Sequence, residues 1–184
     1  MIIVIVVVVL VLLLGLTFVL IRNGMIASRN KVDESWSGID VQLKRRHDLV
    51  PNLVETVKGY ATHENQTFTA VTQARADAMK AGTVEATQEA EAKLSGALAD
   101  LRAVAEQYPN LRATENFQQL QRGLNEIEDE IQASRRIYNS NVQAYNTKIQ
   151  IFPNSIVANS GGFTAREFFE ITDATEREPV EVKF

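Results

Sequence analysis

Residues 114–152, TENFQQLQRGLNEIEDEIQASRRIYNSNVQAYNTKIQIF, decide the fold. The stretch has no Pro and one Gly, Gly123, and its apolar side chains recur at alternating steps of three and four. That spacing marks one face of a helix, so we expect a helix of about 39 residues, 58 Å long. A stripe of this length is not stable alone in water and must face other helices. Its positions are Phe117, Leu120, Leu124, Ile127, Ile131, Ser134, Tyr138, Asn141, Tyr145, Lys148 and Phe152.

Two further helices are expected on either side of Pro51, over residues 25–49 and 52–80. Pro51 has no N–H and strains the preceding turn, so it either begins a new helix or kinks a continuous one. Within 52–80, Glu64 and Arg75 occupy two positions of an otherwise apolar stripe. The sequence leaves both readings of Pro51 open.

A fourth helical segment is expected between Thr83 and the Tyr108-Pro109 pair. Gly82 is expected as the C′ residue of the helix before it, and Thr83 as the N-cap of the new helix. Four long helices joined by short loops form an antiparallel bundle. The predicted fold class is therefore all-α.

Residues 1–21, MIIVIVVVVLVLLLGLTFVLI, carry no charge, and 19 of them are apolar. As a helix they span about 32 Å, which matches the hydrocarbon core of a bilayer. No Lys or Arg precedes the run, it is longer than the apolar part of a signal peptide, and no Ala-x-Ala follows. We therefore expect a retained transmembrane helix rather than a cleaved signal.

The positive charges follow this span and do not precede it, beginning with Arg22, Arg29 and Lys31. The positive-inside rule then places the soluble part in the cytoplasm and the N-terminus outside. The expected organisation is a membrane helix at 1–21, a helical bundle at 22–171 and a charged tail at 172–184.

The composition excludes several classes of function. The chain has 19 Lys and Arg, 23 Asp and Glu, a net charge of −4 and no Cys. An acidic chain is not a general nucleic-acid binder, and without Cys there is no disulfide, thiol catalysis or Cys-ligated zinc. The sequence has no glycine-rich phosphate loop and no nucleophile elbow. We therefore expect no enzyme, no cofactor, no resident metal and no nucleic-acid partner.

The stretch from Trp36 to Val54, WSGIDVQLKRRHDLVPNLV, followed by VKGYA at 57–61 and His63-Glu64, resembles the LemA family. Other matching features are Asn116-Phe117, Leu120-Gln121, Arg136 to Asn139, Tyr145-Asn146, Phe152-Pro153, Gly162-Phe163 and Phe168 to Glu170. The resemblance implies a single-pass protein of the bacterial inner membrane with a cytoplasmic bundle of about four long helices. It implies no established molecular function and no catalytic residues. It also implies a link to a membrane peptidase or a TPM-domain protein, because family genes often lie near theirs.

Two groups of residues are candidates for interaction. Lys44, Arg45 and Arg46 form a basic run, which either makes ion pairs with Asp40, Asp48 and Glu55 or contacts a partner's anionic groups. Phe163, Phe168 and Phe169, with Ile171, form an apolar group. This group either docks on its own bundle or is offered to a partner.

His47-Asp48 and His63-Glu64 are the two His–carboxylate pairs. Adjacent residues on a helix point in different directions, whereas helical metal ligands are commonly three or four residues apart. We therefore expect surface or capping roles for both histidines.

The sequence predicts a membrane-anchored helical scaffold or interaction protein that self-assembles and organises or shapes the envelope. The expected partners are the lipid bilayer, through residues 1–21, and further copies of the chain. The first alternative is an adaptor that regulates a membrane peptidase or other envelope enzyme. The second is a hydrolase that uses His47 or His63.

Overall fold

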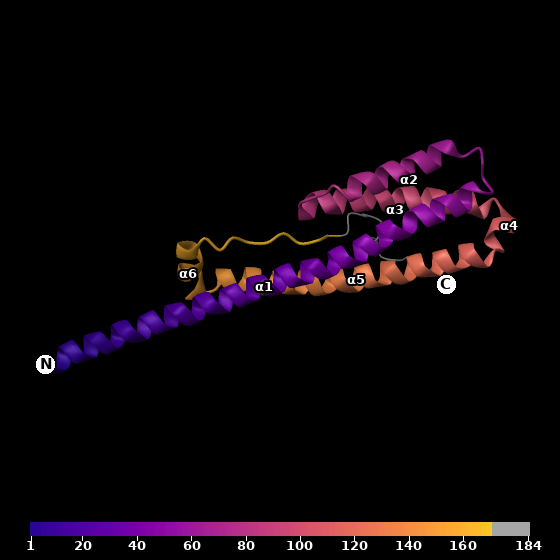
Figure 1. The fold of residues 1–184 in the computed structure, drawn as a ribbon. Coiled ribbons are helices and arrows are strands. Elements are labelled where there is room, and N and C mark those ends of the chain that lie inside the picture. The colour runs from indigo at the N-terminus through magenta and orange to yellow at the C-terminus, as the bar shows by residue number, and fades with distance from the viewer. Residues whose placement is uncertain (171–184) are drawn as a thin grey trace, which may run out of the picture. The chain divides into compact units, whose positions relative to one another are not determined.

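The computed structural model describes residues 1–170, which contain helices and no strand, as Figure 1 shows. The all-α prediction is confirmed. The predicted tail at 172–184, and Ile171, lie outside the described residues. The helices are α1 Ile2–Lys58, α2 Asn65–Ala78, α3 Val84–Glu106, α4 Pro109–Arg112, α5 Glu115–Gln150 and α6 Asn154–Gly161.

Helix α1 continues through Pro51 and ends at Lys58, so the chain neither reverses nor starts a new helix at the proline. The predicted helix over residues 52–80 is wrong, because its first part belongs to α1 and its second part is α2. The apolar pattern hides the break because Ala61, between the two helices, is as fully buried as the helical Val57 before it.

The described residues divide into two compact units, each with buried side chains of its own. Unit 1 contains residues 1–38 and 136–168. Unit 2 contains residues 39–135 together with Phe169 and Glu170.

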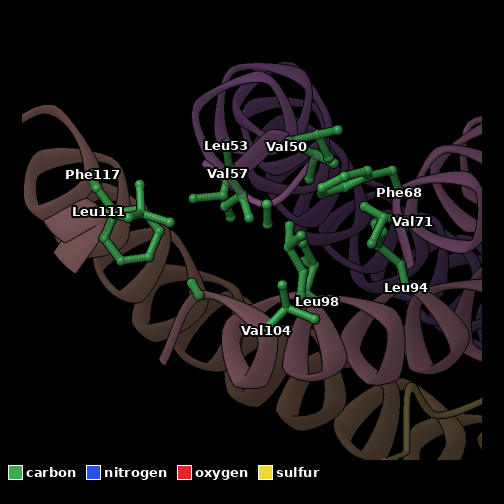
Figure 2. Close-up of a cluster of buried hydrophobic side chains, with 14 of the residues drawn as sticks. Val50, Leu53, Val57, Phe68, Val71, Leu94, Leu98, Val104, Leu111 and Phe117 are labelled. Carbon is green, nitrogen blue, oxygen red and sulfur yellow. The ribbon is translucent and has the colours of Figure 1, made fainter. Parts of the chain in front are cut away.

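The core of unit 2 contains side chains from five helices. Figure 2 shows Val50, Leu53 and Val57 of α1 directed towards α2 and α3. Fully burying one such side chain contributes about 1.5–3 kcal/mol. The apolar faces of α1, α2 and α3 therefore meet one another. The other buried residues are Val54, Ala61, Phe68, Val71, Ala78, Leu94, Leu98, Leu101, Val104, Ala105, Leu111 and Phe117.

Helix α3 begins as predicted, with Thr83 as N-cap accepting the N–H of Ala86 at 3.1 Å. The prediction for Gly82 is wrong, because among the described residues the one glycine with a positive φ is Gly162, at 68°. Helix α2 instead ends through Met79, which keeps right-handed helical angles and donates to the carbonyl of Arg75. The link needs no left-handed residue.

In unit 1, α1 and α5 pack together along the predicted stripe. Tyr138 and Tyr145 are buried, and the ring of Tyr138 lies 5.3 Å from that of Trp36. Two polar stripe positions find partners on α1, since Lys148 Nζ donates to the Gly24 carbonyl at 2.7 Å and the Asn141 side chain donates to the Lys31 carbonyl at 3.4 Å. The predicted stripe fails at its end, because Phe152 lies beyond α5 and is 81% exposed.

The start of α1 is exposed along its whole length from Ile2 to Leu20. Residues 1–170 contain one helix that is long and apolar enough to cross a membrane. This matches the predicted transmembrane segment, and the first fully buried side chain after it is Met25.

Candidate functional site

Helix α1 directs Arg46 of the basic run, and His47 beside it, into the interior of unit 2. Arg46 and His47 lie three and four residues after Leu43, and four and three residues before Val50, so all four share one helical face. Arg46 is 3% exposed and His47 is 7% exposed. The expectation that His47 lies at the surface is therefore wrong, and this helical spacing was the signal for its burial.

Both buried side chains bind the carboxylate of Glu91 on α3. Arg46 Nη1 donates to Glu91 Oε2 at 2.9 Å, and His47 Nε2 lies 2.6 Å from Glu91 Oε1. Arg46 Nη2 donates to Ser95 Oγ at 2.7 Å and pairs with Glu128 Oε1 of α5 at 2.8 Å. Buried charges persist only when they are paired in this way, so the cluster joins three helices and leaves its carboxylates occupied.

The rest of the basic run stays at the surface. Lys44 pairs with Asp48 at 3.6 Å, one of the predicted pairs, and Arg45 donates to Gln42 at 3.0 Å. Arg46 departs from the prediction, because its carboxylate partners come from α3 and α5 rather than from neighbouring positions in the sequence.

A second polar contact explains Arg75, which interrupts the apolar stripe of α2. Pro51 has no N–H to donate to the residue four positions earlier, so the carbonyl of His47 lacks its normal helical partner. Arg75 Nε donates to that carbonyl at 2.6 Å. The arginine thus satisfies the backbone group that the proline leaves free.

The charged cluster borders a groove of about 560 Å³ in unit 2. The face of α3 that lines it carries small side chains at helical spacing, Ala92, Ser95, Gly96 and Ala99. Side chains this small let another chain approach the helix closely. The remaining lining residues are Leu43, Arg46, Gln88, Glu91, Glu128, Ile131, Gln132, Arg135 and Phe169.

The chain itself occupies part of this groove. Phe169 is 3% exposed, and the guanidinium carbon of Arg135 lies 4.7 Å from the centre of its ring. Arg135 Nη2 donates to the carbonyl of Glu170 at 2.6 Å, and the N–H of Glu170 donates to Gln88 Oε1 at 3.0 Å. The two side chains therefore hold an extended backbone through its main-chain polar groups.

The other two aromatic residues of the predicted group belong to unit 1. Phe163 lies under the guanidinium of Arg29, 5.8 Å from it, whereas Phe168 is 40% exposed. Between them, Arg166 pairs with Asp33 at 2.9 Å and exchanges backbone hydrogen bonds with the Asn146 side chain. The group thus docks on its own chain through Phe163 and Phe169, and Phe168 remains available.

His63 lies exposed in the α1–α2 connection, and no hydrogen bond or ion pair joins it to His47 within residues 1–170. The same residues contain no group of three or more His, Asp or Glu placed to hold a metal ion. The arrangement around Arg46 suits the joining of helices and the holding of a peptide more than acid–base chemistry.

Comparison with known proteins identifies similar sequences. A family model described as the LemA family matches residues 35–184. The protein LemA of Metamycoplasma hominis is 28% identical over 141 residues, which cover 74% of this chain and 63% of that protein.

Magnetosome proteins are also similar. Magnetosome protein MamQ 2 of Paramagnetospirillum magneticum is 24% identical over 180 residues, covering 84% of this chain and 66% of that protein. Magnetosome protein MamQ of Magnetospirillum gryphiswaldense is 24% identical over 181 residues, with the same coverage. The chain thus spans less than two-thirds of the length of these curated relatives.

Proposed function

Because the chain belongs to the LemA family, we propose that it is a membrane-tethered helical scaffold that works by binding protein, beginning with further copies of itself. The apolar helix and the family membership together indicate a membrane-associated protein. The family is not known as a family of enzymes. In this proposal the bundle lies in the bacterial cytoplasm, as the charges that follow the span favour.

The observation that supports a protein-binding role is the capture of Glu170 by Gln88 and Arg135. Both contacts are made to main-chain atoms, so any extended segment with a large side chain at the preceding position meets the same requirements. Phe169 is that side chain here. Main-chain hydrogen bonds that supply affinity, with a side-chain pocket that supplies specificity, are a common mode of peptide recognition.

The same contact offers a route to assembly. The captured segment follows Gly161-Gly162, a connection in which Gly162 already has a left-handed backbone angle of 68°. A segment that leaves its own groove at such a joint can enter the groove of a second copy with every contact preserved. Exchange of an identical element is a route to assembly that requires little new binding surface.

The test is the mass of the full-length protein in detergent, measured by mass photometry over a range of concentrations. Assemblies that dissociate on dilution and are weakened by Phe169→Ala, but not by Phe168→Ala, support exchange. A monomer at every concentration overturns self-association. Assemblies that Phe169→Ala leaves unchanged overturn the groove as their cause.

The second candidate function is that of an adaptor whose groove binds a segment of a different membrane protein. The polar residue Gln132 along the groove could bind a partner other than this chain. Gentle purification from membranes separates the two functions, because an adaptor brings a membrane peptidase or TPM-domain protein with it, whereas a self-assembling scaffold gives one band. A role in shaping membranes would appear as altered liposomes.

A further inference from the structure

Residues 149–165 form the longest stretch without charge outside the apolar start of the chain. The seventeen residues, IQIFPNSIVANSGGFTA, contain no Asp, Glu, Lys or Arg, although such residues are 23% of the whole sequence. The stretch includes the end of α5, all of α6 and the connections on both sides of α6. A solvent-facing corner of a soluble bundle has no physical need to exclude charge.

The same corner exposes large apolar side chains. Phe152 is 81% exposed, Ile156 62% and Ile151 51%, whereas Val157 and Ala158 on the other side of α6 are buried. Helix α6 therefore packs on unit 1 through one face and presents apolar groups with the opposite face. Exposed apolar groups gathered in one place mark an interaction surface.

Hydrogen bonds between α1 and α5 show which residues of α1 lie beside this corner. Asn141 on α5 donates to the carbonyl of Lys31 on α1, and Lys148 donates to that of Gly24, so seven residues along α5 correspond to seven residues back along α1. Continuing this antiparallel register to the end of α5 places Gln150 level with Arg22. The turn that follows then lies beside Leu20 and Ile21, where the apolar run of α1 ends.

We propose that the corner formed by Ile151, Phe152 and Ile156 is a second membrane contact, inserted into the headgroup boundary of the bilayer that α1 crosses. A run of about twenty apolar residues fills the hydrocarbon core, so its last residues mark the boundary. Interfacial segments bury their apolar side chains about 5–10 Å into this boundary. The inference rests on membrane association and does not require self-association.

A second contact has a mechanical result. One transmembrane helix alone leaves unit 1 free to tilt together with the helix, whereas a corner held in the same leaflet resists tilting that lifts it out of the boundary. Unit 1 would then keep a defined tilt relative to the membrane.

The absence of Cys from the chain gives a direct test. Single-cysteine variants L20C, F152C, I156C and I137C of the full-length protein receive a neutral fluorophore and enter nanodiscs with or without brominated lipid. Ile137 is the matched control, because it is an apolar residue of α5 that is 59% exposed and level with Ser35, about 22 Å farther from the boundary. Quenching by brominated lipid reports the depth of the label, and reaction with a water-soluble quencher reports exposure.

We expect the labels at 152 and 156 to be quenched by brominated lipid to at least half the extent seen at 20, and the label at 137 to be unaffected. Ile156→Asp should greatly reduce the quenching at 152. Labels at 152 and 156 that behave like the label at 137 overturn the proposal. Labels protected from both quenchers also overturn it, because they show that another protein copy covers the corner. An unquenched label at 20 overturns the membrane premise itself.

Discussion

The side chain of Arg75 on α2 occupies the hydrogen-bond position that Pro51 leaves open on α1, because its Nε donates to the carbonyl of His47 at 2.6 Å. A proline within a helix normally costs about 3 kcal/mol or more. Here a neighbouring helix supplies the missing donor, so the proline and the arginine form one structural feature.

This relationship predicts that the two residues are energetically coupled. Arg75→Ala should destabilise the protein by about 1–3 kcal/mol, the cost of leaving a partly buried carbonyl without a partner. In a Pro51→Ala background the carbonyl regains a helical N–H, so the same substitution should cost clearly less. Urea unfolding in detergent, followed by circular dichroism, measures all four proteins. Equal costs in the two backgrounds would show that Arg75 has another role.

Arg46→Ala should destabilise the protein by about 3–5 kcal/mol, because it leaves the carboxylates of Glu91 and Glu128 without their cation. Lys44→Ala is the matched control, two positions away in the same basic run. Its pair with Asp48 has side chains that are 79% and 61% exposed, so its removal should cost less than about 1 kcal/mol. Similar losses in the two variants would contradict the assignment of Arg46 to the core.

Phe169→Ala should release the segment that ends at Glu170. Hydrogen exchange of the Glu170 amide reports this release, because that N–H is bonded to Gln88 in the native protein. Exchange should become much faster in Phe169→Ala and remain native in Phe168→Ala, since Phe168 is 40% exposed whereas Phe169 is 3% exposed. An unchanged Glu170 amide in the first variant would mean that Phe169 does not hold the segment.

Tyr138 predicts a loss of stability at alkaline pH. Burial raises the pKa of its phenol above the ordinary value of 10.0, Arg166 opposes this, and Glu167 and Asp33 add to it. The folded state therefore holds the proton more tightly than the unfolded state, so the contribution of Tyr138 to stability should be fully present below about pH 10 and be lost above it. Tyr138→Phe removes the bond to the Glu167 carbonyl, costing about 0.5–1.5 kcal/mol at neutral pH, and should reduce the alkaline decline. Melting temperatures across this pH range test both effects.

Thr83→Ala should cost about 1 kcal/mol, because the hydroxyl caps α3 by accepting the Ala86 N–H. Thr83→Ser keeps that acceptor and should remain close to the parent protein. Thermal unfolding of the pair isolates the cap from other effects at the same position.

Periodicity and composition predicted the class of fold because they record which face of each helix is apolar. The long stripe from Phe117 to Tyr145, the cap at Thr83 and the apolar start of α1 all follow from local sequence. The end of α1 at Lys58 does not, since the buried Ala61 continues the apolar pattern through a non-helical connection.

The candidate site was harder to predict, because its contacts join residues far apart in sequence. Arg46 and Glu91 are separated by 45 positions, and no local pattern identifies them as partners. The burial of His47 could have been predicted from its position between Leu43 and Val50. Its type argued against burial, because an ionisable residue enters a core only with a partner that the sequence does not identify.

The candidate membrane span and the packed part of unit 1 belong to one unbroken helix, with Ile21 four residues before the fully buried Met25. No flexible linker separates this span from the folded part, so unit 1 cannot move away from a membrane that the span crosses. The continuous helix holds unit 1 at a fixed height above the lipid. A partner therefore meets unit 1 only at that height, whether it diffuses within the membrane or arrives from solution.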